Sequence, residues 1–155
     1  MATTTTISQV GEFPLISSMV GDLTMGQAVT LGPGDDGAVF QVDGSAVVST
    51  DVLVEEVHFR RRWSTATDVG RKAVAVNVSD IEAMGAVPVA LVVGFSAPGD
   101  LPASWAREFM AGMTAESQKA GVSVVGGDTT GGPVVSIAVT VIGQTAGMAP
   151  VRRDG

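Results

Sequence analysis

The order of β-branched runs and helix-periodic segments constrains the fold of this chain more than any other feature. Trp105, Phe109 and Met113 recur at a spacing that places them on one face of a helix. That helix stands between runs rich in valine and isoleucine, which favour strands. The sequence predicts helices over 68–84 and 102–120, and strands over 87–95, 122–125 and 134–142. This order indicates an α+β fold, a mixed four-stranded sheet with helices on one face.

The remaining segments are interpreted from turn signals and short periodic patterns. Asp43-Gly44 is a two-residue turn signal between the apolar runs 38–42 and 46–50, which predicts a β-hairpin and places Asp51 at the end of its second strand. A short helix is expected over 11–22. The glycine-rich segments 31–37 and 126–132 are expected to be loops. Residues 1–10 are predicted to be a flexible lead, and 11–155 one domain.

Composition narrows the function classes. The chain has 155 residues, 45% of them hydrophobic, which is enough for one globular core. Sixteen acidic residues against nine basic ones give a net charge of −7, so nucleic acid is a poor candidate partner. The absence of cysteine excludes disulfides and thiolate chemistry. Neither a signal peptide nor a membrane-spanning run is visible, and we expect a cytoplasmic protein without a membrane partner.

Aspartates at loops and element ends are the residues most suited to chemistry. They lie beside glycine, serine or threonine, which leaves room for a bulky ligand and adds hydroxyl oxygens: Asp35, Asp36, Asp51, Asp80 and Asp128. Hard cations such as Mg²⁺ prefer oxygen ligands and bind through one or two carboxylates plus substrate phosphates. Each aspartate taken alone is more often a turn or cap residue. Four such clusters could nevertheless hold several ions around a triphosphate.

Several motifs together resemble the amino-terminal domain of thiamine-monophosphate kinases. The resemblance covers nearly all of 11–155 and rests on the segments at 11–13, 32–38, 49–59, 72–86 and 126–130, which include Gly32-Pro-Gly-Asp-Asp-Gly-Ala38 and Ser49-Thr-Asp51. It implies an aminoimidazole ribonucleotide synthetase-like domain. It also implies ATP-dependent phosphorylation of thiamine monophosphate to thiamine diphosphate, with several Mg²⁺ ions bridging the phosphates. A homodimer paired through the sheet is implied too, with a carboxy-terminal half of the family absent from this chain.

The resemblance also implies roles for particular residues. It implies metal ligation by Asp36, Ser49, Thr50, Asp51, Asp80 and Asp128, and the four aspartates of that set are the expected catalytic residues. Gly127, Asp128 and Arg153 are expected to bind ATP, with Arg152 as the alternative arginine. His58, the single histidine, is expected to contact the substrate phosphate, although an isolated histidine is more often structural. The run Arg60–Arg62 is most simply a solvated loop.

Two other function classes remain open at this point. Other ATP-using enzymes of the same architecture, such as aminoimidazole ribonucleotide synthetases, are similar in fold but differ in their motifs. The non-enzyme alternative is that this half alone is an inert module for dimerisation and nucleotide binding. Assays with different acceptors separate the enzymes from one another and from the inert module.

Overall fold

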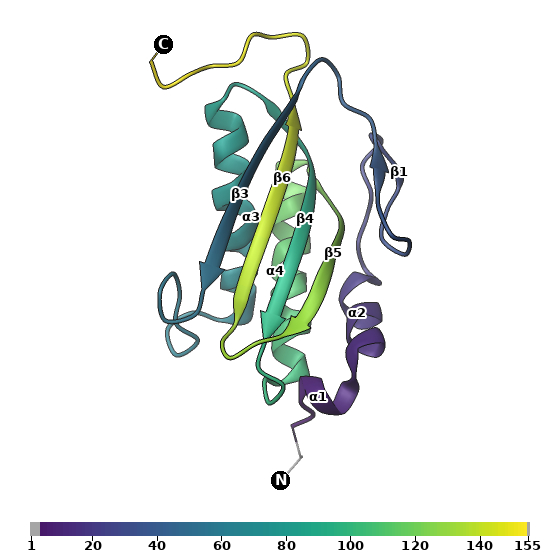
Figure 1. Ribbon diagram of the computed structural model, residues 1–155, viewed down its shortest axis with the longest axis vertical. Helices are drawn as coiled ribbons and strands as arrows, with labels where there is room; N and C mark the ends of the chain where they lie inside the picture. The colour runs from purple at the N-terminus through teal and green to yellow at the C-terminus, as the bar shows by residue number, and fades with distance from the viewer. Residues whose placement is uncertain (1–3, 155) are drawn as a thin grey trace.

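The structure is a computed structural model that describes residues 4–154. Its elements are α1 (Ile7–Val10), α2 (Glu12–Val20), β1 (Val29–Leu31), β2 (Val39–Phe40), β3 (Ala46–Val54), α3 (Ala66–Ala83), β4 (Val87–Ala97), α4 (Ala103–Ala120), β5 (Ser123–Gly131) and β6 (Ser136–Gln144). Figure 1 shows one twisted sheet with α3 and α4 against the same face, while β1 and α2 lie to one side. The predicted α+β fold, a mixed four-stranded sheet with helices on one face, is confirmed.

The sheet has the order β3-β6-β4-β5. β3 pairs with β6 in antiparallel register, from Ala46 opposite Gln144 to Val54 opposite Ser136. β6 also pairs antiparallel with β4, and β4 pairs parallel with β5, the two being joined by α4. A parallel connection needs such a crossover element, which explains why a helix separates these two strands in the sequence.

The two long helices are defined by local sequence signals and pack closely on each other. The Thr65 hydroxyl caps α3 by accepting a hydrogen bond from the backbone N–H of Asp68, and the Asp68 carboxylate accepts one from the Thr65 N–H. α4 ends at Gly121, which adopts the left-handed conformation that favours glycine. A Cβ at Gly70 or Gly112 would clash with the backbone of the opposite helix, so glycine permits this close approach.

The main core lies between the helices and one face of the sheet. Phe95 of β4 stacks on Trp105 and Phe109 of α4, with ring centroids 6.4 and 5.6 Å apart. Phe59 stacks on the same tryptophan at 6.4 Å. Trp105, Phe109 and Met113 therefore serve packing, as their helical spacing predicts.

The opposite face of the sheet is largely uncovered by other elements. Val48, Val52 and Val92 project from it with 62, 46 and 38% of their surface exposed. Only one end of this face is covered, where residues from the β1–β2 region pack on Val89, Ala90 and Val125 in a second, smaller core. A row of exposed valines on a sheet is an apolar surface of the kind that serves association.

The hairpin predicted around Asp43-Gly44 is wrong. β2 pairs with β1 in a separate two-stranded sheet, and β3 pairs with β6 instead. The predicted turn is instead connected to the segment after β6, where the Asp43 carbonyl accepts a hydrogen bond from the Ala146 N–H. Nine registered pairs with β6 outweigh the short local ladder that a hairpin would have formed. Consequently β3 continues to Val54, and Asp51 lies inside the strand rather than at its end.

Three further segments differ in extent from the sequence prediction. The glycine cluster 126–132, predicted as a loop, belongs largely to β5 because it pairs with β4 as far as Gly131. The short strand β1 was not predicted at all. The second half of the predicted flexible lead contains α1. A hydrogen bond from the Ile7 N–H to the Leu101 carbonyl holds α1 against the segment that precedes α4. Residues 1–3 of that lead lie outside the described part of the chain.

Candidate active site

Ser49 and Asp80 form the best-defined polar contact among the predicted site residues. The Ser49 hydroxyl on β3 donates to the Asp80 carboxylate on α3 over 2.9 Å. Side chains alternate along a strand, so Asp51 projects from the same face of β3 as Ser49, the face covered by the helices. Asp51 is exposed because β3 is the edge strand. The structure therefore brings Ser49, Asp51 and Asp80 to one edge of the sheet.

Thr50 and Asp128 project from the other, uncovered face. The Thr50 hydroxyl donates to the Val139 carbonyl over 3.0 Å and is also bonded to the Thr140 hydroxyl. Asp128 stands opposite Gly94 in the β4–β5 register, and Gly94 stands opposite Ala138 of β6. Small residues beside Asp128 leave its carboxylate accessible. Within one chain, the sheet itself thus separates Asp128 from Asp51 and Asp80.

Asp35 and Asp36 lie in the exposed loop between β1 and β2. The Asp36 N–H donates to the Asp35 carboxylate over 2.9 Å, a local contact that orders the turn. Across residues 4–154, no three side chains of the acidic, histidine or cysteine type lie close enough together to hold one metal ion. The predicted metal ligands are therefore distributed over an edge, a face and a loop of the single chain.

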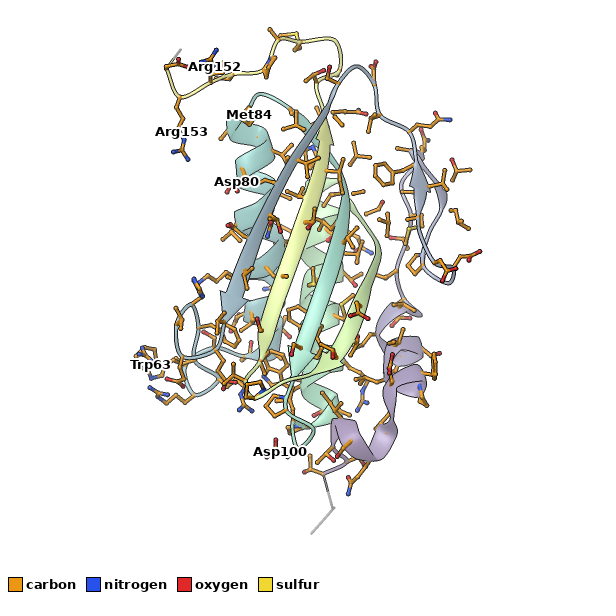
Figure 2. All side chains as sticks on the ribbon, viewed as in Figure 1. Trp63, Asp80, Met84, Asp100, Arg152 and Arg153 are labelled. Carbon is orange, nitrogen blue, oxygen red and sulfur yellow. The ribbon has the colours of Figure 1, made fainter. Side chains whose placement is uncertain are left out.

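The predicted ATP-binding residues occupy two different places. Gly127 lies on β5, where a Cβ would clash with the Val93 carbonyl, so glycine is required for close strand pairing. Arg153 lies in the carboxy-terminal segment, beside the same end of α3 as Asp80 and Met84 (Figure 2). That segment is held there because the Val151 N–H donates to the Met84 carbonyl over 2.8 Å. Arg152 instead pairs with Asp154.

His58 lies in the segment between β3 and α3. Its Nδ1 atom accepts a hydrogen bond from the Val54 N–H over 3.0 Å. The neutral ring therefore carries its proton on Nε2, which remains a hydrogen-bond donor. Lys72 of α3 donates to the His58 carbonyl over 2.6 Å and ties this segment to the helix. Lys72 was not assigned a role from the sequence, because only the fold brings it next to His58.

The arginine run lies in a solvent-exposed loop, as the sequence indicates, and its side chains are also paired. Arg60 and Arg62 bind the two oxygens of the Glu56 carboxylate, at 3.0 and 2.7 Å. Desolvation opposes ionisation of Glu56, but the hydrogen bonds and charges of these two arginines outweigh it and lower its pKa. Arg61 pairs with Glu55. Beside these pairs lies an open cleft of about 190 Å³.

A family model for AIR synthase related protein, N-terminal domain, matches residues 34–145. The chain belongs to this family. It is 48% identical over 151 residues to a thiamine-monophosphate kinase of Mycobacterium tuberculosis (strain CDC 1551 / Oshkosh), a match that covers 97% of this chain and 45% of that protein. The resemblance to thiamine-monophosphate kinases that the motifs indicate is confirmed by this match. The chain spans a little under half the length of this curated relative.

Two solved structures of this architecture are similar as well. A thiamine-monophosphate kinase from Stenotrophomonas maltophilia K279a is 34% identical with a TM-score of 0.73, over 90% of this chain and 42% of that one. AaThiL complexed with AMPPCP and TMP is 28% identical with a TM-score of 0.62, over 92% of this chain and 44% of that one. A protein whose fold is similar to that of this chain is thus complexed with AMPPCP and TMP.

Proposed function

We propose that the protein to which this chain belongs is a thiamine-phosphate kinase, which transfers the γ-phosphoryl group of ATP to thiamine monophosphate. The observation that carries the proposal is the 48% identity to a thiamine-monophosphate kinase over 97% of the chain. The site chemistry supports it, since carboxylates and a hydroxyl gather at one edge of the sheet. Other acceptors within the family have less support, because the motifs that they would require are not the ones present here.

Mg²⁺ fits the donors that the chain supplies. Carboxylate and hydroxyl oxygens are the ligands that this hard cation prefers, and we propose that Asp36, Ser49, Thr50, Asp51, Asp80 and Asp128 hold several ions. Bound Mg²⁺ would neutralise the charge of the two phosphates. The Ser49–Asp80 hydrogen bond holds the Asp80 carboxylate in place beforehand. Such orientation lowers the entropic cost of assembling the reacting groups.

No general base is required in the proposed transfer. The acceptor phosphate is already anionic near neutral pH, where the second pKa of a phosphomonoester is about 6. Catalysis then consists of charge neutralisation and in-line positioning. His58 is proposed to donate from Nε2 to the acceptor phosphate. Gly127, Asp128 and Arg153 are proposed to contact ATP. The cytoplasmic location stays a prediction from the sequence.

A homodimer through the uncovered sheet face is part of the proposal. The exposed row of Val48, Val52 and Val92 would be buried against its twin, which stabilises association through the hydrophobic effect. Asp128 lies on this same face, so pairing would place its carboxylate beside a second chain. One chain does not gather three acidic ligands within residues 4–154, so we propose that the substrate phosphates and a second chain supply further oxygen ligands.

Measuring ADP release in the presence of thiamine monophosphate, ATP and Mg²⁺ tests the proposal. We expect the complete gene product to release ADP and form thiamine diphosphate, and chelation of Mg²⁺ to abolish both. ADP release with an aminoimidazole ribonucleotide precursor, but not with thiamine monophosphate, would assign the protein to another enzyme class of the family. Metal-dependent ATP binding by residues 1–155 without turnover on any acceptor would favour the inert module for this half.

Across residues 4–154, none of the helices is both long and apolar enough to cross a bilayer.

A further inference from the structure

The segment 55–64, which follows β3, is a rigid surface element rather than a free loop. Glu55 and Phe59 form a bridge between the ends of its turn, and Arg61 binds the Glu55 carboxylate. Lys72 of α3 holds the His58 carbonyl. Val54 is three residues beyond Asp51, about 10 Å along the strand. The segment therefore presents a fixed surface near the proposed metal ligand Asp51.

The cleft of about 190 Å³ is formed almost entirely by this segment. It is lined by Val57, His58, Phe59, Arg60, Trp63 and Ser64. Four of these residues carry hydrogen-bond donors, namely His58, Arg60, Trp63 and Ser64, and none carries a carboxylate. The Glu56 carboxylate that binds Arg60 lies beside the cleft rather than in its lining, so the cleft offers an anion hydrogen-bond donors rather than an unpaired positive charge.

Trp63 is the most unusual side chain of the cleft. Its indole is 71% exposed, although an exposed tryptophan leaves a large apolar area in water. The Arg60 and Arg62 guanidinium carbons lie 4.4 and 5.0 Å from its ring centroid. Both guanidinium groups are fastened to the one Glu56 carboxylate. Figure 2 shows Trp63 at the opposite end of the molecule from Arg153. The indole is thus held in position yet remains open to a ligand.

We propose that Trp63 is a specificity-determining residue that stacks on the ring system of a phosphorylated heteroaromatic acceptor. His58 Nε2 donates to the phosphate end of the same ligand, and the indole contacts its ring end. The proposal rests on the proposed function and specifies which part of the acceptor each side chain contacts. It predicts a contribution to acceptor binding that is separate from ATP binding.

Kinetic constants of Trp63 variants in the complete gene product test the inference. Trp63→Ala is expected to raise the KM for thiamine monophosphate about tenfold, the loss that one aromatic stacking contact implies. The KM for ATP and the melting temperature are expected to stay unchanged. Trp63→Phe keeps a flat ring and should recover most of the affinity. Phe13→Ala, which removes a similarly exposed aromatic ring from α2, is the matched control and should leave both KM values unchanged.

Tryptophan fluorescence gives a readout that does not depend on turnover. Thiamine monophosphate and unphosphorylated thiamine should both quench the wild-type emission, and the quenching should disappear in Trp63→Phe, which leaves Trp105 as the only indole. An unchanged KM for thiamine monophosphate in Trp63→Ala, or quenching that persists in Trp63→Phe, would overturn the inference. If the wild type transfers no phosphate but its emission is quenched in this way, the proposed function fails while the ring contact stands.

Discussion

At the scale of single residues, one hydrogen bond between side chains defines the position of the candidate active site. The Ser49 hydroxyl connects the edge strand β3 to Asp80 of α3, and Asp51 projects from the same face two residues further along. The sequence identified these residues through motifs, but it did not show that Thr50 and Asp128 project from the opposite face. Strand pairing decides that arrangement, and pairing depends on residues about 90 positions away. Spacing within a motif places Thr50 on the opposite face of a strand from Ser49, but it does not show which face the helices cover or on which face Asp128 lies.

Asp51→Asn tests the proposed metal ligation at this scale. The change removes a negative charge with little change in volume, so we expect turnover to fall about 100-fold or more, as when one electrostatic contact to a reacting group is lost. The melting temperature should change little because Asp51 is exposed. Asp100→Asn, an exposed aspartate in a turn away from Ser49, is the matched control. Steady-state kinetics with full activity in Asp51→Asn would reject the assignment.

Asp68 gives a prediction for the dependence of stability on pH. Hydrogen bonds from the Thr65 side chain and backbone lower its pKa below the ordinary 3.8. Because the pKa of Asp68 is lower in the folded than in the unfolded state, its ionised carboxylate stabilises the fold fully above pH 3.8. That stabilisation is lost as the pH falls through the folded-state pKa. Thr65→Ala removes the cap and should lower the free energy of unfolding by about 1 kcal/mol. The free energy of unfolding should also depend less on pH in the acidic range. Denaturant titrations between pH 2 and 6 measure both effects.

Among the elements, the long helices were predictable and the strand pairing was not. The apolar stripe over 102–120 is a local signal, and α4 forms where it places a helix. The helix predicted over 68–84 also forms, but α3 begins two residues earlier, at Ala66, because Thr65 is its N-cap. Asp43-Gly44 is also a local signal, but it gave a wrong hairpin because β3 gains a longer ladder with the distant β6. The glycines of 126–132 indicated a loop, although β5 includes most of them.

The contact between α3 and α4 depends on two glycines. A methyl group at Gly112 would clash with the Thr67 backbone, and one at Gly70 with the Phe109 carbonyl. Gly112→Ala should therefore lower the free energy of unfolding by about 1–3 kcal/mol, as overpacking does in other cores. Gly131→Ala is the control, because a Cβ there meets no atom within 4 Å. Equal stabilities of the two variants in urea unfolding would contradict this packing.

At the scale of the whole molecule, the uncovered face of the sheet is the proposed dimer interface, and the oligomeric state of variants tests that role. Val52→Glu places a charge in the row of exposed valines and should convert the expected dimer into a folded monomer. Val39→Glu introduces the same charge at an exposed valine of β2, outside this row, and should leave the dimer intact. Sedimentation equilibrium measures both masses. A wild-type monomer, or a Val52→Glu dimer of undiminished stability, would contradict the proposed interface.

The account depends on carboxylates from separate parts of the fold sharing divalent cations with two phosphates. Anomalous diffraction from crystals of the complete gene product, grown with Mn²⁺ in place of Mg²⁺ and an ATP analogue, locates those cations directly. We expect manganese peaks within bonding distance of Asp51 and Asp80, with phosphate oxygens on the same ions. Ions bound to the nucleotide alone, with both carboxylates facing solvent, would contradict the central claim.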